Sequence, residues 1–115
     1  MYLINRWVAI VKPKQPLVDW LNDLPDLEEK PATPEEVRQD CTAILLPDFT
    51  ELDEGREFIK KIYEGLFNLE LSAWCEDQEA WPQNRDYVLF RQWFDVEIHS
   101  MVIDPFEDAI EKEKI

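Results

Sequence analysis

The sequence predicts a single small α+β domain: a three-stranded sheet with helices packed mainly on one face, in the order β-α-α-β-α-α-β. Two patterns predict this fold class. Some segments repeat apolar residues with a period of about 3.6 residues, as amphipathic helices do, and three shorter segments are rich in β-forming residues. The chain has 115 residues, of which 45% are hydrophobic, so one core can form without disulfides or metal. The sequence does not determine the strand order.

The first half of the chain predicts a strand, two short helices and a second strand. Residues 5–11 (NRWVAIV) are rich in β-forming residues and end before two prolines, which interrupt strand pairing. Residues 16–24 carry leucines and a tryptophan at helical spacing. Thr33 precedes Pro-Glu-Glu, which is typical of a helix start with a capping box. Residues 41–46 (CTAILL) form an uninterrupted apolar run and predict a buried strand.

The second half predicts two helices and a last strand. The longest apolar stripe predicts a helix from about residue 50 to residue 75, with Trp74 pointing inward. Residues 81–93 predict a further helix, and residues 94–103 alternate polar and apolar side chains as a half-buried strand does. We expect one compact domain over residues 1–104. The tail, residues 105–115, is expected to be a marginal helix or frayed.

Composition predicts an aromatic core and a strongly acidic surface. The chain contains five Trp and six Phe, and its 26 acidic residues exceed its 12 Lys and Arg to give a net charge of −14. This charge repels the phosphates of nucleic acids and anionic lipids, so direct nucleic-acid binding is disfavoured. Residues 15–57 alone hold thirteen acids and three bases. A basic protein partner, attracted electrostatically, fits this excess.

Several classes of site and compartment are disfavoured by what the sequence lacks. Both glycines, Gly55 and Gly65, fall inside the predicted long helix, so there is no glycine-rich phosphate loop, and we expect no cofactor. Cys41 and Cys75 match neither a redox pair nor a zinc site and are expected to be buried, reduced thiols. No membrane span or secretory leader is evident. We therefore expect a soluble, cytoplasmic protein without membrane contact.

The first candidate site is Asp95-x-Glu97-x-His99 on the last predicted strand. Residues two apart on a strand share a face, so these side chains stand in a row. Two carboxylates and the only histidine of the chain could hold a divalent ion or perform acid–base catalysis. The alternative is that alternation simply places polar residues on the solvent face of a half-covered sheet.

A second candidate is the positively charged N-terminal segment, and a third is a tryptophan. Arg6, Lys12 and Lys14 give residues 1–14 a charge of +3, and a helix start follows them, so an anion or a partner's carboxylate could bind there. The alternative is that these cations pair with the protein's own acids. Trp81 flanks a proline and is expected to be partly exposed, where it could contact a partner.

These features support three hypotheses for function. The leading one is a non-enzymatic protein-interaction or regulatory domain that binds a basic partner, with homodimer formation through a free sheet edge compatible with it. The second is a small metal-assisted or acid–base enzyme that uses Asp95, Glu97 and His99. The third is an acidic inhibitor that mimics DNA, which requires carboxylates spaced like phosphates.

Overall fold

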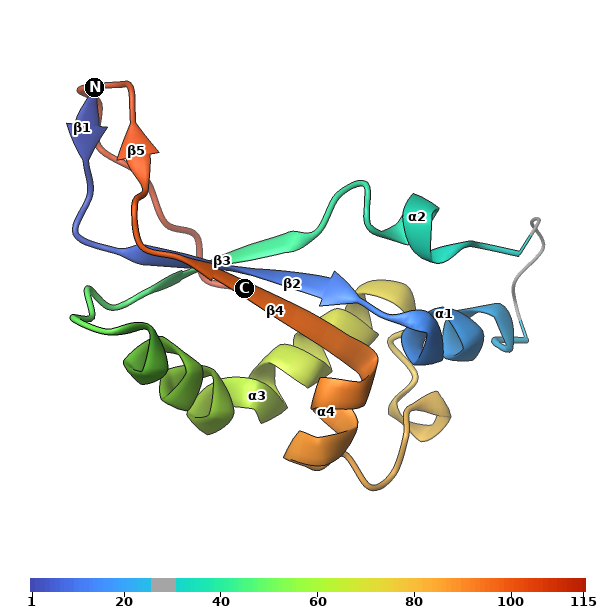
Figure 1. Ribbon diagram of the computed structural model, residues 1–115. Helices are drawn as coiled ribbons and strands as arrows, with labels where there is room; N and C mark the ends of the chain where they lie inside the picture. The colour runs from blue at the N-terminus through green and yellow to red at the C-terminus, as the bar shows by residue number, and fades with distance from the viewer. Residues whose placement is uncertain (26–30) are drawn as a thin grey trace.

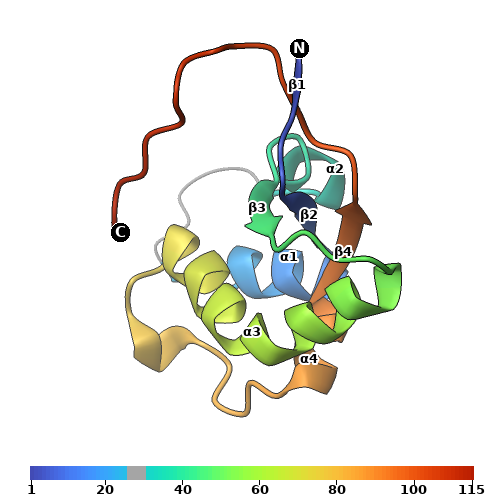
Figure 2. The same cartoon turned by 90° about the vertical axis from the view of Figure 1, so that its left-hand side faces the viewer.

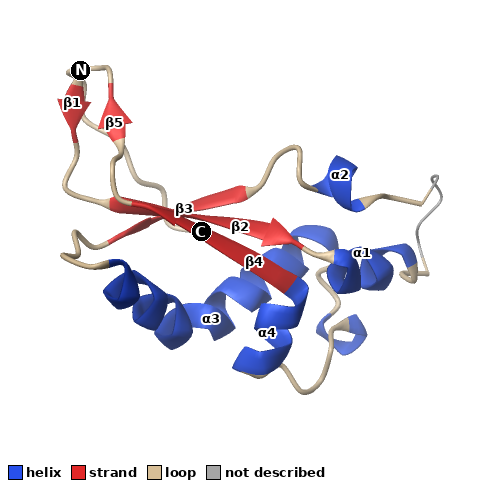
Figure 3. Cartoon of the chain, viewed as in Figure 1, coloured by secondary structure: helices blue, strands red, loops and turns tan. Residues whose placement is uncertain are grey.

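The computed structural model describes residues 1–25 and 31–115 and confirms the α+β fold class. Three helices, α1, α3 and α4, lie together on one side of a three-stranded antiparallel sheet (Figures 1 and 3). In chain order the elements are β1 (Tyr2–Leu3), β2 (Trp7–Pro13), α1 (Gln15–Asn22), α2 (Pro34–Val37), β3 (Thr42–Leu46), α3 (Leu52–Trp74), the 3₁₀ helix η1 (Gln78–Ala80), α4 (Tyr87–Trp93), β4 (Phe94–His99) and β5 (Ile103–Asp104).

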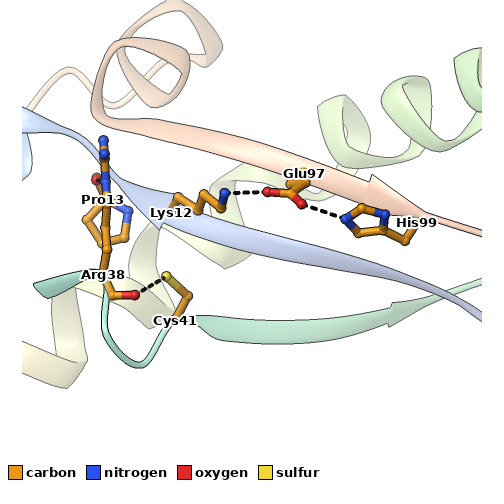
Figure 4. Close-up of polar contacts among 6 residues, drawn as sticks. All are labelled: Lys12, Pro13, Arg38, Cys41, Glu97 and His99. Atoms are coloured by element: carbon orange, nitrogen blue, oxygen red, sulfur yellow. Dashed lines mark hydrogen bonds and ion pairs between the residues drawn. The ribbon is translucent and has the colours of Figure 1, made fainter. Parts of the chain in front are cut away.

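The strand order, which the sequence left open, is β3-β2-β4. β2 is the central strand and alternates strictly: Trp7, Ala9, Val11 and Pro13 are buried, whereas the residues between them are half-buried. Pro13 can end a central strand because its missing N–H falls at the last ladder position. Its carbonyl is used instead, since it accepts a 2.6 Å hydrogen bond from Nε of Arg38, which follows α2 (Figure 4).

Aromatic side chains form the centre of the core, as predicted. The ring of Phe67 in α3 lies 5.5–5.8 Å from the rings of Phe90, Trp93 and Phe94, centroid to centroid. Phe67, Phe90 and Phe94 are each at most 2% exposed, so α3, α4 and β4 meet at one desolvated point. Aromatic contacts at this spacing add about 0.5–1.5 kcal/mol each beyond the area they bury.

The predicted long helix is confirmed as α3, but its last turn is not buried. The helix starts with a capping box, in which Glu51 and Glu54 each bond the other's backbone N–H. Trp74 lies on the same side of the helix as Leu71, yet it is 46% exposed, so the prediction that it points into the core is wrong. The apolar stripe continues for one turn beyond the last buried residue.

The helix predicted over residues 81–93 is shorter than expected. It begins at Tyr87, where the side chain of Asp86 accepts a 2.8 Å bond from the Leu89 N–H. Trp81 instead ends η1 and is only 7% exposed, so the prediction that it is partly exposed is wrong. Its indole N–H donates to the Cys75 carbonyl at 2.8 Å, which lets the polar end of this ring be buried.

The strand predicted over residues 94–103 is divided in two. β4 ends at His99, and the chain pairs again as β5 with β1, a strand that the sequence analysis did not predict. The pairing register shifts by one residue between Val8–His99 and Leu3–Ile103, as a β-bulge produces, and the second ladder turns away from the first. Residues 1–4 and 101–106 therefore form a projection, which we name the terminal arm (Figure 1).

The terminal arm lengthens the molecule, and the tail does not fold onto the body as a helix. The radius of gyration is 15.9 Å, whereas a compact chain of this length has about 13 Å. Residues 105–115 are exposed and contain no helix or strand, so of the two expected alternatives, a marginal helix or a frayed tail, the helix does not form (Figure 2). The Asp104 carboxylate accepts a bond from the Phe106 N–H and starts a turn there instead. None of the helices in the described part of the chain has the length and apolar character that crossing a bilayer requires.

Candidate functional site

The first candidate site lies on the face of the sheet that is turned away from the core. β4 buries Phe94 and alternates, so that Asp95, Glu97 and His99 project from the opposite face. Across the ladder, Lys12 of β2 stands opposite Asp95, and Ile10 stands opposite Glu97. The sequence therefore placed the three side chains on one face correctly, and the register adds a lysine that the prediction treated separately.

Glu97 is the centre of the polar contacts at this site (Figure 4). One carboxylate oxygen forms an ion pair with Nζ of Lys12, and the other lies 2.6 Å from Nε2 of His99. The hydrogen bond from Lys12 and then the bond with His99 hold the pKa of Glu97 below its usual value. The same carboxylate raises the pKa of Lys12. The side chain of Asp95 is not part of any ion pair within the described residues.

This geometry is poorly suited to acid–base catalysis by Asp95, Glu97 and His99. The Lys12, Glu97 and His99 side chains are 37–55% exposed, so a substrate placed on them would remain in contact with water. A carboxylate whose pKa is lowered by two partners is also a weak base. Among the described residues, no three His, Cys, Asp or Glu side chains lie close enough together to share a metal ion. The arrangement links β2 to β4 across the ladder.

The second candidate does not converge on a single point. Arg6 and Lys12 are six residues apart on one extended segment, a separation of roughly 20 Å. Arg6 donates to the carbonyl and side-chain oxygens of Asn5, at 2.8 and 3.1 Å. Lys14 donates to the Arg91 carbonyl of α4 at 3.1 Å. Lys14 also lines a pocket with Arg56 and Arg91, two cations that the sequence analysis did not connect with it.

Both cysteines are free thiols and are only half-buried, so the expectation that they are buried is wrong. Partial burial raises the pKa of Cys41, which makes its thiol a poor nucleophile at neutral pH. Its Sγ lies 3.4 Å from the Arg38 carbonyl (Figure 4). Cys41 precedes β3 and His99 ends β4, so these two residues occupy opposite edges and opposite ends of the sheet.

A buried carboxyl in α3 escaped the sequence analysis. Glu70 is 8% exposed, and its Oε1 is a buried oxygen without a hydrogen-bond partner in the described part of the chain. Burial raises the pKa of Glu70, and the neighbouring Thr42 of β3 opposes this shift. The available sequence signal was its position, one residue before Leu71 on the inward stripe, where an acid is unusual.

Comparisons of this chain with protein-family models, curated proteins and solved structures found no match.

Proposed function

We propose that this chain is a non-enzymatic interaction domain that binds a basic protein partner through its terminal arm. The observation that carries the proposal is the apolar surface of the arm. The arm projects from the body and presents large apolar side chains to solvent, and such surfaces in a monomer are typical of docking sites. These side chains, with their exposed fractions, are Met1 (90%), Leu3 (68%), Met101 (73%), Ile103 (47%) and Phe106 (70%).

The charges around the arm favour a partner whose apolar surface is bordered by lysine or arginine. A groove of about 510 Å³ runs between the arm and the tail. Three acids, Asp104, Glu107 and Asp108, and two bases, Arg6 and Lys112, line it together with apolar side chains, so the acids are in slight excess. Glu107 already accepts a 2.9 Å bond from the Tyr2 hydroxyl, which ties the tail to β1. The net charge of the chain, −14, adds a long-range attraction for a basic partner.

Affinity capture with two matched variants tests this proposal. The arm variant combines Leu3→Ser, Met101→Ser and Phe106→Ser; the control combines Leu52→Ser, Leu69→Ser and Val88→Ser, three exposed apolar positions on α3 and α4. From a lysate of the source cells at about 50 mM salt, wild type and control should retain the same basic protein. The arm variant should lose it, and so should wild type at about 500 mM salt.

The identified protein must then bind purified wild type, and not the purified arm variant, in calorimetry. Retention that is equal for the arm variant and the control would overturn the proposal. Displacement of the captured protein by added duplex DNA would instead support the hypothesis of a DNA-mimicking inhibitor.

A specific observation also favours self-association, through β3. This strand lies at the edge of the sheet, and the described residues give it no neighbour besides β2. It contains no charged residue, although a third of the chain is charged, and Leu45 on its outer face is 49% exposed. Unprotected edges of this kind pair with other strands. Two antiparallel copies of β3 centred on Ile44 would set each Leu45 against Ala43 of the other copy.

Salt dependence separates self-association from binding of a basic partner. Two chains of charge −14 repel each other, so added salt should strengthen the homodimer, whereas it should weaken a complex with a basic protein. Leu45→Lys should shift the mass measured by light scattering towards the monomer. Val88→Lys, which adds the same charge at an exposed position of α4, should not. A wild-type monomer at all concentrations and salt levels would overturn self-association and leave the partner proposal untouched.

A further inference from the structure

We propose that a pocket between α3, α4 and β4 binds a small organic anion, a carboxylate or phosphate carried on an apolar body. The pocket has a volume of about 310 Å³, at the lower end of the range for small-molecule sites. Lys14, Arg56 and Arg91 line it, so three of the twelve Lys and Arg of a strongly acidic chain meet around one hollow. This inference is independent of the proposed interaction function.

The polar groups of the pocket come from three separate parts of the chain. Arg56 is one turn into α3, Arg91 is in the last turn of α4, and Lys14 follows β2. Lys14 is held in place because its ammonium donates to the Arg91 carbonyl at 3.1 Å. Among the described residues that line the pocket, Asp95 is the only carboxylate. The balance of charge at the pocket is therefore positive, opposite to that of the molecule.

The cations that line this pocket form no strong ion pair within the described residues. Arg56 pairs with Asp53 at 3.0 Å, but both side chains are more than 60% exposed. Exposed pairs of this kind contribute only about 0.2–1 kcal/mol, so an anion in the pocket can compete for the guanidinium. The Arg91 guanidinium lies 6.0 Å from the centre of the Tyr87 ring, and Arg91 forms no ion pair within the described residues.

The walls of the pocket supply the apolar component. Ile59 and Phe90 are buried core residues that line it, and Tyr87, Val96 and Ile98 add half-buried apolar surface. An inorganic ion would leave this surface unused, whereas an aryl or alkyl carboxylate or phosphate would cover it. Apolar walls with a few convergent charged groups are the usual composition of sites for such ligands.

The test is a titration of the ¹⁵N-labelled full chain with benzoate, phenyl phosphate and benzyl alcohol, followed by NMR chemical shifts. Either anion should shift the amides of Ile59, Tyr87 and Val96 and bind at least about tenfold more tightly than the neutral alcohol. The tighter of the two anions indicates whether the natural ligand carries a carboxylate or a phosphate.

Matched variants assign the binding to the pocket. Arg56→Gln and Arg91→Gln should each weaken binding about tenfold, whereas Lys61→Gln, which removes a charge from α3 outside the pocket, should leave it unchanged. Circular dichroism checks that each variant is folded. No shift at these amides up to about 10 mM anion, equal binding of the alcohol, or equal weakening by Lys61→Gln would each overturn the proposal.

Discussion

The two edge strands of the sheet both pair with β2, yet they are built in different ways. β4 inserts Phe94 into the aromatic centre of the core and fills its outer face with Asp95, Glu97 and His99. β3 likewise buries one residue fully, Leu46, but it leaves Ala43 and Leu45 exposed on its outer face. Charged side chains on an edge discourage pairing with other strands, and β3 has none. The β4 edge is therefore both anchored and protected, and the β3 edge is the one open to a second strand.

The two edge strands also differ in how α3 packs beneath them. Under β4, α3 packs against the sheet at Gly55, where an added Cβ would make ordinary van der Waals contact with Ile98, at 3.5 Å. Under β3, α3 presents Glu70, whose buried oxygen has no partner among the described residues. Burying an unsatisfied polar group costs free energy. We infer that stability is concentrated on the β4 side of the domain and that the β3 side bears a local cost.

The largest expected effect tests the anchoring of β4. Phe94→Ala should lower the free energy of unfolding by about 3–5 kcal/mol, because it removes a fully buried ring and leaves a cavity. Leu45→Ala, at the half-exposed position of β3, should lower it by no more than about 0.5 kcal/mol. Urea unfolding followed by circular dichroism measures both. Similar losses for the two variants would contradict the asymmetry of the edges.

The second prediction concerns Glu70, whose buried carboxyl lies beneath β3 and lowers the stability of the fold. Glu70→Gln should raise the free energy of unfolding at pH 7 by about 1 kcal/mol, because the buried group no longer carries a charge. Burial raises the pKa of Glu70 in the folded state, so the wild type loses stability as the pH rises from the unfolded pKa through the folded one. The gain from the substitution should therefore shrink towards pH 4.

Glu64→Gln is the matched control for that prediction, since Glu64 is exposed on the same helix. It should change the stability little at either pH. A gain that persists unchanged at low pH would show that ionisation of Glu70 is not the cause.

The smallest expected effect concerns the protected β4 edge, where Glu97 contacts Lys12. Lys12→Met should raise the pKa of Glu97 towards its usual value, because the lysine is the largest cause of the lowering. The contribution of Glu97 to stability is present above its unfolded pKa and is lost as the pH falls through the lowered folded pKa. A carbon-detected NMR titration of the carboxyl group measures the change. An unaltered midpoint would mean that Lys12 does not hold this carboxylate in solution.

The contrast between the edges also shows which features of the candidate site can be predicted from the periodicity of the sequence. Alternation from Phe94 to His99 was enough to place Asp95, Glu97 and His99 on one face. It did not reveal that Glu97 joins Lys12, since this contact depends on the register of β4 against β2. The cations of the pocket, at positions 14, 56 and 91, were unpredictable for the same reason. Their elements are distant in sequence and meet only when α3 and α4 dock under the sheet.

Local sequence by itself determined the α+β class, the strands at β2 and β3, the long helix α3 and the acidic character of the chain. These follow from side-chain periodicity, caps and composition, which act over a few residues. Tertiary structure alone decided the strand order, the pairing of the two chain ends into the terminal arm, the burial of Trp81 and Glu70, and the gathering of cations around one pocket. Each of these depends on contacts between segments far apart in sequence, whose free energy no local pattern records.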